Sequence, residues 1–256
     1  MNAIQSQQSR QPFLRLKNVS KSFGHVQALD KVNLDIHEDE IVGLVGDNGA
    51  GKSTLVKILS GVYFADECEI EVDDKLVDIK TPGDAQSQGI ATVYQDLALV
   101  DHRDVASNIY LGMEPKTAGV IINRRKMWAD AKTVIESVRT TIESAKTEVG
   151  ILSGGQRQAV AIARSLVRGS RLFIMDEPTA ALGVEQSAMV LSLLSDLKER
   201  GAGVLLISHN MSHVFDVVDR VVVLRHGKKV AERIKSESSP EEIVGLITGA
   251  IDGELG

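Results

Sequence analysis

The stretch EIVGLVGDNGAGKS, residues 40–53, decides the fold. Its first half, up to Gly46, is an apolar run that ends in glycine, which is typical of a strand covered on both faces in a parallel sheet. Its second half, GDNGAGKS from Gly46 to Ser53, fits the phosphate-binding loop pattern in full. Residues 52–60 then predict a helix ended by Gly61. This order of strand, loop and helix predicts a site for the phosphates of a nucleoside triphosphate.

The residue types of this loop suit phosphate oxygens, which need many N–H donors close together. Glycines let the backbone curl so that its N–H groups converge, and the following helix presents free N–H groups and a positive dipole end. We expect Lys52 to neutralise the outer phosphates and the Ser53 hydroxyl to hold Mg²⁺. The predicted nucleotide contacts of the loop are Gly46, Asp47, Asn48, Gly49, Ala50, Gly51, Lys52, Ser53 and Thr54. The loop by itself leaves kinases, GTPases and motor proteins open.

The second half of the chain predicts a parallel sheet. Strands expected at 172–175, 204–208 and 221–224 alternate with helices expected at about 154–168 and 185–200. Strands that alternate with helices of this length favour crossover connections between parallel strands.

The first half has two other patterns. Residues 13–36 alternate apolar and polar side chains, which indicates half-buried antiparallel strands, and residues 69–72 predict one more short strand. Residues 97–150 have few β-branched runs and predict helices around 107–111 and 126–144. The expected fold class is therefore α/β, a P-loop NTPase with a RecA-like parallel sheet core, an antiparallel β subdomain and an inserted helical lobe.

The expected division of the chain follows from these patterns. Residues 1–11 are polar and rich in Gln and Ser, which predicts a disordered tail without a secretion signal. Residues 12–250 are expected to form one ATPase domain, with the helical lobe at about 97–168. Residues 251–256 are expected to form a C-terminal tail.

Composition narrows the classes of function. The 256 residues carry a formal net charge of -6, which argues against a general nucleic-acid binder. The short basic runs at 124–126 and 225–229 are interpreted as solvated turns. The single cysteine, Cys68, cannot form an intrachain disulfide, so a structural thiol in a reducing compartment is expected. No apolar run approaches the roughly 20 residues that span a bilayer.

The segment LSGGQRQ, residues 152–158, separates the nucleotide-binding classes. Ser153 can cap the following helix, and Gly154 and Gly155 leave the N–H groups of that helix bare, which makes a second anion site. The segment resembles the signature loop of ATP-binding-cassette (ABC) ATPases. The resemblance implies that Ser153, Gly154, Gly155 and Gln156 cover the γ-phosphate of ATP on a facing subunit, and hence a head-to-tail homodimer with two ATP molecules at its interface.

The segment LFIMDEP, residues 172–178, resembles the Walker B segment of the same family. The apolar strand ends at the carboxyl edge of the sheet, where such folds bind ligands. The resemblance implies that Asp176 binds Mg²⁺ and that Glu177 acts as general base on the attacking water. Adjacent strand residues face opposite ways, so two neighbouring carboxylates can take two roles. An Asp-Glu pair elsewhere is usually surface charge.

Three further residues match the family one by one. Gln95 in VYQD corresponds to the glutamine that touches Mg²⁺ and leads into the helical lobe, although taken alone it would be read as a surface residue. His209 matches the switch histidine that contacts the γ-phosphate. Phe23 in SKSFG matches the aromatic residue that stacks on adenine, and its alternative reading is a core strand residue.

One position departs from the family. Many members have aspartate where Gly183 stands, after EPTAAL, and glycine offers no side chain to couple the two sites. The resemblance covers about residues 13–250, and details such as VYQDLALV and NIYLGMEP are similar to the ATP subunits of bacterial simple-sugar importers of the ribose, xylose and fructose group. Many of those carry two cassettes, whereas this chain has one phosphate loop and one LSGGQ.

The resemblance implies an ATPase with ATP and Mg²⁺, peripheral on the cytoplasmic side of the cell membrane. Its implied partners are transmembrane permease subunits and, indirectly, a sugar-binding protein outside the membrane, with no nucleic acid. Two alternatives stay open. A soluble ABC ATPase acting on DNA or ribosomes usually adds coiled-coil arms or a second cassette, which this chain lacks. A cassette that binds ATP without turnover is disfavoured by the presence of Lys52, Asp176, Glu177 and His209.

Overall fold

The computed structural model of the protein describes residues 11–253. Almost all of the expected N-terminal tail, residues 1–10, and the last three residues of the expected C-terminal tail lie outside the described residues. A six-stranded sheet forms the centre of the molecule, in the strand order β12-β11-β3-β10-β9-β6. Its strands are β3 (Ile41–Val45), β6 (Ile90–Val93), β9 (Leu172–Asp176), β10 (Gly203–Ile207), β11 (Arg220–Arg225) and β12 (Lys228–Ile234).

The central sheet is parallel except at one edge, where β12 runs antiparallel to β11. The inner strands β3 and β10 are buried along their whole length, as expected for strands covered on both faces. A second, antiparallel sheet has the order β2-β1-β4-β5. Its strands are β1 (Leu14–Phe23), β2 (Val26–Ile36), β4 (Glu67–Val72) and β5 (Lys75–Val77). These two sheets confirm the predicted fold class of a P-loop core with an antiparallel β subdomain.

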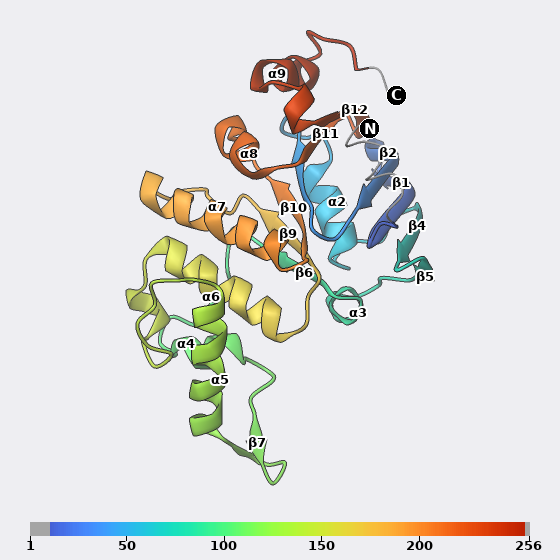
Figure 1. Cartoon of the computed structure of the whole chain (residues 1–256). Coiled ribbons are helices and arrows are strands. Elements are labelled where there is room, and N and C mark those ends of the chain that lie inside the picture. The colour runs from blue at the N-terminus through green and yellow to red at the C-terminus, as the bar shows by residue number, and fades with distance from the viewer. Residues whose placement is uncertain (1–10, 254–256) are drawn as a thin grey trace.

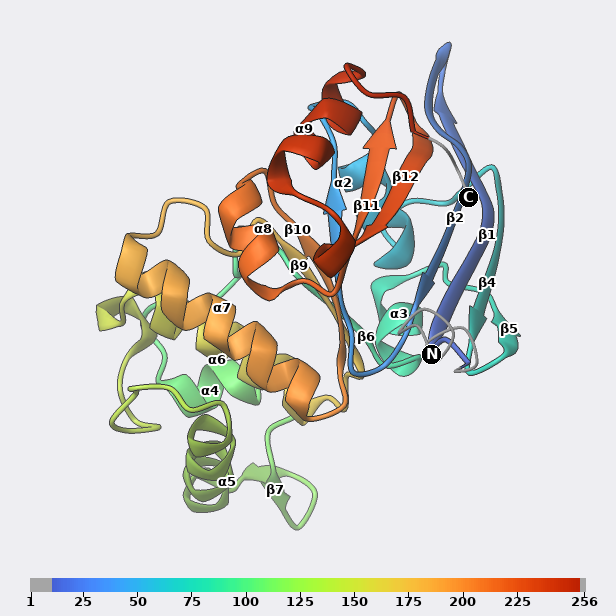
Figure 2. The same ribbon diagram turned by 45° about the horizontal axis from the view of Figure 1, so that its top comes forward.

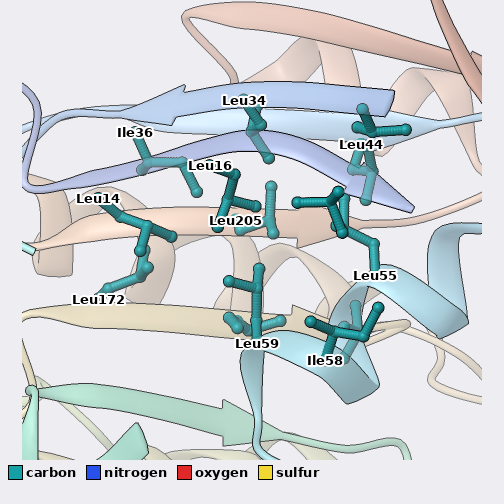
Figure 3. Close-up of a cluster of buried hydrophobic side chains, with 14 of the residues drawn as sticks. Leu14, Leu16, Leu34, Ile36, Leu44, Leu55, Ile58, Leu59, Leu172 and Leu205 are labelled. Atoms are coloured by element: carbon teal, nitrogen blue, oxygen red, sulfur yellow. The ribbon is translucent and has the colours of Figure 1, made fainter. Parts of the chain in front are cut away.

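A shared core joins the two sheets. Helix α2 (Lys52–Leu59) packs among the apolar side chains of both, and Figure 3 shows Leu16 and Leu34 of the antiparallel sheet beside Leu205 of the central sheet. Each of these leucines is at most 1% exposed, and full burial of one leucine side chain stabilises the fold by about 1.5–3 kcal/mol. The start of α2, and with it the phosphate loop, is therefore held by both sheets.

Helices cover the rest of the central sheet. Figures 1 and 2 show α7, α8 and α9 on the face away from α2, where they enclose a second apolar cluster. A third cluster lies within the helical lobe at one end of the molecule. The helices concerned are α3 (Pro82–Ser87), α4 (Val105–Ile109), α5 (Arg124–Ser137), α6 (Gly154–Val167), α7 (Val184–Glu199), α8 (Met211–Val217) and α9 (Pro240–Thr248).

Two of the predicted helices in the lobe were misplaced. The helix expected at 126–144 ends at Ser137, because Arg139 adopts a left-handed φ of 47° and the chain beyond it runs irregularly, with Ile142 buried in the lobe core. The helix expected around 107–111 begins earlier, at Val105, because the Asp104 carboxylate caps it by accepting the Ser107 N–H at 2.7 Å.

Several short elements had no counterpart in the sequence analysis. They include strand β6, the two-residue strands β7 (Lys116–Thr117) and β8 (Ile121–Ile122), helices α3, α8 and α9, and the 3₁₀ turns Val149–Ile151 and Lys235–Glu237. The basic runs were interpreted as solvated turns, but residues 124–126 form the first turn of α5, and Lys228 and Lys229 belong to β12. Cys68 lies exposed in β4. Within residues 11–253, none of the helices combines the length and the apolar character that a bilayer span requires.

A buried ion cluster ties the start of β11 to the turn before β3. The Arg220 guanidinium donates to Glu40 at 2.5 Å, to Glu232 at 2.5 Å and to the main-chain carbonyl of Asp35. The Arg220 and Glu40 side chains are only 10% and 4% exposed. A buried pair of this kind contributes through the cost of breaking it rather than through net attraction.

Replacement of Arg220 by alanine is expected to lower the free energy of unfolding by about 3–5 kcal/mol, because it leaves the Glu40 carboxylate buried without its partner. Urea denaturation followed by circular dichroism measures this loss. The control is Lys132→Ala, which removes the exposed pair to Glu136 at 3.7 Å and should cost at most about 1 kcal/mol. Equal losses in the two variants would contradict the role assigned to Arg220.

Candidate nucleotide-binding site

The phosphate loop follows β3 and is shaped by three glycines with left-handed backbone. Their φ values are 152° at Gly46, 82° at Gly49 and 106° at Gly51. A β-carbon at Gly46 would lie 2.2 Å from the carbonyl oxygen of Leu224, and one at Gly51 would lie 2.6 Å from that of Ala28. The loop therefore curls against neighbouring backbone at a distance that only glycine permits.

Lys52 stands at the start of α2 and reaches back across the loop. Its Nζ donates to the carbonyl oxygens of Gly46 at 2.6 Å and Asp47 at 2.9 Å. Burial lowers the pKa of Lys52 below its ordinary value, against the attraction of Glu177, Asp47 and Asp176. The ammonium group is thus held over the loop, where phosphate oxygens could replace the weaker carbonyl acceptors.

Two carboxylates lie where β9 ends. Burial, and secondly the neighbouring Glu177, raises the pKa of Asp176 above its ordinary value, while Lys52 and Lys57 act against this. Glu177 leaves the strand with a left-handed φ of 51°, and its N–H donates to the Ile207 carbonyl at 2.9 Å. This backbone conformation is uncommon for a residue other than glycine and turns the Glu177 side chain away from the strand direction.

The Glu177 carboxylate meets the histidine that follows β10. Oε1 of Glu177 lies 2.9 Å from Nδ1 of His209. The His209 side chain is 78% exposed, whereas that of Glu177 is 21% exposed. The carboxylate therefore has one hydrogen-bond partner on its open side and remains accessible to a water molecule.

These residues line one open pocket of about 1120 Å³. The structure brings the whole predicted phosphate loop together there with Gln95, Asp176, Glu177 and His209, although these segments lie far apart in the sequence. The remaining lining residues are Val26, Gln27, Ala28 and Ile207. Sequence reasoning missed Val26, an apolar side chain that is 67% exposed at the pocket; its exposure could not be foreseen from an alternating strand.

The donor set suits Mg²⁺ bound together with a phosphate. Ser53, Gln95 and Asp176 line the same pocket and offer only oxygen ligands. Among residues 11–253, no group of three or more His, Cys, Asp or Glu side chains could hold a metal ion by itself. Mg²⁺ typically uses one or two carboxylates and completes its shell with water and substrate phosphates. The residues present therefore fit this ion in the presence of a nucleotide.

Phe23, the predicted adenine contact, does not itself line this pocket, but it pairs across β1 and β2 with Val26, which does. Its ring is 44% exposed and makes an edge contact with Tyr63, with the ring centroids 5.3 Å apart. Lys21 lies 5.5 Å from the Phe23 ring centroid. The alternative reading as a core residue does not hold, since 44% of Phe23 remains exposed to solvent.

The loop LSGGQ also lies outside the pocket. Ser153 caps α6 by accepting the Gln156 N–H at 3.3 Å, and the Gln156 side chain accepts the Ser153 N–H at 2.9 Å. A β-carbon at Gly154 would lie 2.4 Å from Leu182, and one at Gly155 would lie 2.4 Å from Met189. The two glycines therefore also leave room for side chains of α7 and of the segment that precedes it.

Gly183 begins α7 as its N-cap without a side-chain cap. A β-carbon there would meet nothing within 4 Å, so the glycine is not required by packing. Nearby, the hydroxyl of Thr179 lies 3.0 Å from Nδ1 of His213, which links the segment after Glu177 to α8. The sequence analysis did not single out this pair, because two residues of these types 34 positions apart carry no local signal.

Comparisons with known proteins agree on one family. A family model described as ABC transporter matches residues 29–180. A xylose/arabinose import ATP-binding protein of Sulfolobus acidocaldarius is 43% identical over 94% of this chain and 96% of its own length. A fructose import ATP-binding protein of Rhizobium meliloti is 40% identical, again over 94% and 96%.

Solved structures match in fold. A nucleotide-free ATP-binding cassette from an ABC transporter has a TM-score of 0.80 and 25% identity, covering 92% of this chain and 96% of that one. A dimeric post-hydrolysis state of an ATP-binding cassette bound to ADP and Pi has a TM-score of 0.71 and 27% identity, covering 87% and 98%.

Replacement by alanine should have different effects on nucleotide binding and stability at different glycines of this site. Gly46→Ala is expected to weaken binding of a fluorescent ATP analogue strongly and to lower the free energy of unfolding by at least about 2 kcal/mol, because its β-carbon collides with fixed backbone. Gly183→Ala has an ordinary φ of −70° and open space, and should leave both quantities nearly unchanged. Normal binding by the Gly46 variant would refute this account of the loop.

Proposed function

Because the chain belongs to the ABC transporter family, we propose that it binds and hydrolyses ATP to drive uptake of a simple sugar through separate membrane-embedded subunits. The observation that carries this proposal is the single pocket that joins the phosphate loop, Asp176, Glu177 and His209. The sugar class is supported by the two relatives, which are ATP-binding proteins of xylose/arabinose import and of fructose import. Residues 12–250 would form one ATPase domain, with its helical lobe at about 97–168.

The residues would divide the chemistry as follows. Lys52 and the loop N–H groups, together with the start of α2, would bind the phosphates. Glu177 would accept the proton of the attacking water. Its partly exposed carboxylate lines the pocket, with Oε1 2.9 Å from Nδ1 of His209. Ser53, Gln95 and Asp176 would hold Mg²⁺, which when bound neutralises charge on the phosphates. Phe23 or Val26 would contact the base.

Two copies of the chain would complete each site. Ser153, Gly154, Gly155 and Gln156 stand outside the pocket of their own chain, at a capped helix N-terminus suited to an anion. In a head-to-tail dimer they would cover the phosphates bound by the partner. The solved cassette that is dimeric with ADP and Pi supports the pairing of two copies.

The membrane-embedded partner would bind at the surface beside Gln95. A groove of about 320 Å³ lies next to Tyr94 and is also lined by Leu111, Arg164 and Arg168. It joins the central sheet to the helical lobe, so movement of the lobe would reach a segment seated there. We place the protein on the cytoplasmic side of the cell membrane, attached through this partner, with an external sugar-binding protein acting indirectly.

Glu177→Gln is expected to abolish steady-state phosphate release while ATP binding persists, because glutamine keeps the shape of the side chain but cannot accept the proton. In the presence of ATP and Mg²⁺ the variant should accumulate as a dimer in size-exclusion chromatography with light scattering. The matched control is Glu199→Gln, an exposed carboxylate at the far end of α7. Full turnover by the Glu177 variant, or a strictly monomeric trapped state, would count against the proposal.

A further inference from the structure

A small hairpin at the outer end of the helical lobe exposes apolar side chains. Strands β7 and β8 pair antiparallel, with Thr117 opposite Ile121. The exposed fractions are 81% at Val120, 71% at Ile121 and 46% at Ile122. Figures 1 and 2 both show this hairpin projecting beside α5, away from the central sheet. Three consecutive exposed apolar residues are unusual for a surface that meets only water.

The hairpin is held in this projecting position. The Asn123 N–H donates to the Pro115 carbonyl at 2.7 Å, which closes the hairpin at its base. The Asn123 side chain also caps α5 by accepting the Lys126 N–H at 3.1 Å. Because one residue fixes both the hairpin and the helix, the apolar side chains cannot easily fold back onto the lobe.

The hairpin is followed by three consecutive basic residues, of which Arg124 also attracts the Asp104 carboxylate. Arg124, Arg125 and Lys126 occupy the first turn of α5, which contains no acidic residue. In the part of the chain that the structure describes, no carboxylate lies within 4.0 Å of these three side chains. Cations at a helix N-terminus oppose the helix dipole. A basic first turn in a chain of net charge -6 therefore indicates an anionic partner.

A hollow connects this charge to the groove beside Tyr94. It measures about 280 Å³ and lies at the base of the hairpin, where Ile122, Arg103 and Arg124 line it together with one carboxylate, Glu114. Leu111 lines both this hollow and the groove. The two depressions thus adjoin at Leu111 and run from Tyr94, next to Gln95, to Ile122 at the base of the hairpin.

We propose that the hairpin and this hollow bind an acidic, amphipathic segment of the membrane-embedded partner, as a second docking element beyond the groove. This inference rests on the proposed function. The segment would place an apolar side chain in the hollow and its carboxylates against Arg124 and Arg125. A protein segment is favoured over a lipid surface, because a planar layer of headgroups has no side chain to fill a hollow beside the cations.

The test uses inside-out membrane vesicles from source cells that lack this chain, to which the purified full-length protein is added. The double variant Val120→Asp/Ile121→Asp should bind these vesicles at least about tenfold more weakly. Charge reversal by Arg124→Glu/Arg125→Glu should do the same. Basal ATPase activity of both variants should stay unchanged, because none of the four residues lines the nucleotide pocket. The matched control is Leu76→Asp, since Leu76 on β5 is also 71% exposed.

Four outcomes overturn the docking proposal. The first is vesicle binding unchanged in both variants. The second is equal loss in the Leu76 control. The third is wild-type binding to protein-free vesicles of anionic phosphatidylglycerol as strong as binding to the membranes, which would indicate lipid. The fourth is a loss of vesicle binding that parallels a loss of self-association measured by light scattering, which would indicate that the hairpin binds a second copy of the chain.

Failure of the underlying function has a different signature. Energised sugar uptake is measured in cells that carry Glu177→Gln and, separately, the hairpin variants. If Glu177→Gln leaves uptake intact, the proposed function fails. If Glu177→Gln abolishes uptake while the hairpin variants transport and bind normally, only the docking proposal fails.

Discussion

The nucleotide pocket depends on the close approach of backbone segments around the phosphate loop. The turn between β11 and β12 lies against the loop and against β2: the Gly227 N–H donates to the Ala50 carbonyl at 3.1 Å, and the Asp30 N–H donates to the Gly227 carbonyl at 2.8 Å. The loop at Gly46 is in turn pressed against the end of β11. The curvature of the loop is therefore imposed by residues near both ends of the chain. The eight residues of the motif locate the phosphate site, but the whole fold gives it its shape.

The same carboxyl edge of the sheet positions the catalytic candidates. Glu177 follows β9 and His209 follows β10, so parallel pairing of these strands brings them within hydrogen-bond distance. The left-handed backbone at Glu177 is stabilised by its N–H bond to Ile207 on the neighbouring strand. A strained conformation is thus held by the sheet rather than by the residue's own preference, and it aims the side chain into the pocket.

The sequence predicted well what depends on local pattern. The apolar runs of β3, β9 and β10 indicate buried strands because both faces are covered, and the glycine pattern of residues 46–53 indicates where the phosphate loop lies. What it missed depends on tertiary contacts. The helix expected to reach residue 144 stops at Ser137, since Ile142 and Ala145 gain more from packing in the lobe core than from continuing the helix. Phe23 matched a family position, but its contact with Tyr63 involves residues 40 positions apart and left no trace in the sequence.

The LSGGQ loop meets two demands with the same residues. Its glycines give room to the ends of the Leu182 and Met189 side chains, which would have to shift for a β-carbon, and glycines at a helix N-terminus suit the approach of an anion. Gln156 is meanwhile bound to Ser153 and to Thr141, whose hydroxyl lies 3.2 Å from Nε2. The loop is therefore ordered within its own chain before any partner arrives. Because its conformational entropy has already been lost on folding, closing a dimer over a bound nucleotide would cost less than if the loop had to order at that moment. Packing of α6 on α7 thus stabilises the fold and would also favour association of two copies of the chain, although neither helix lines the pocket.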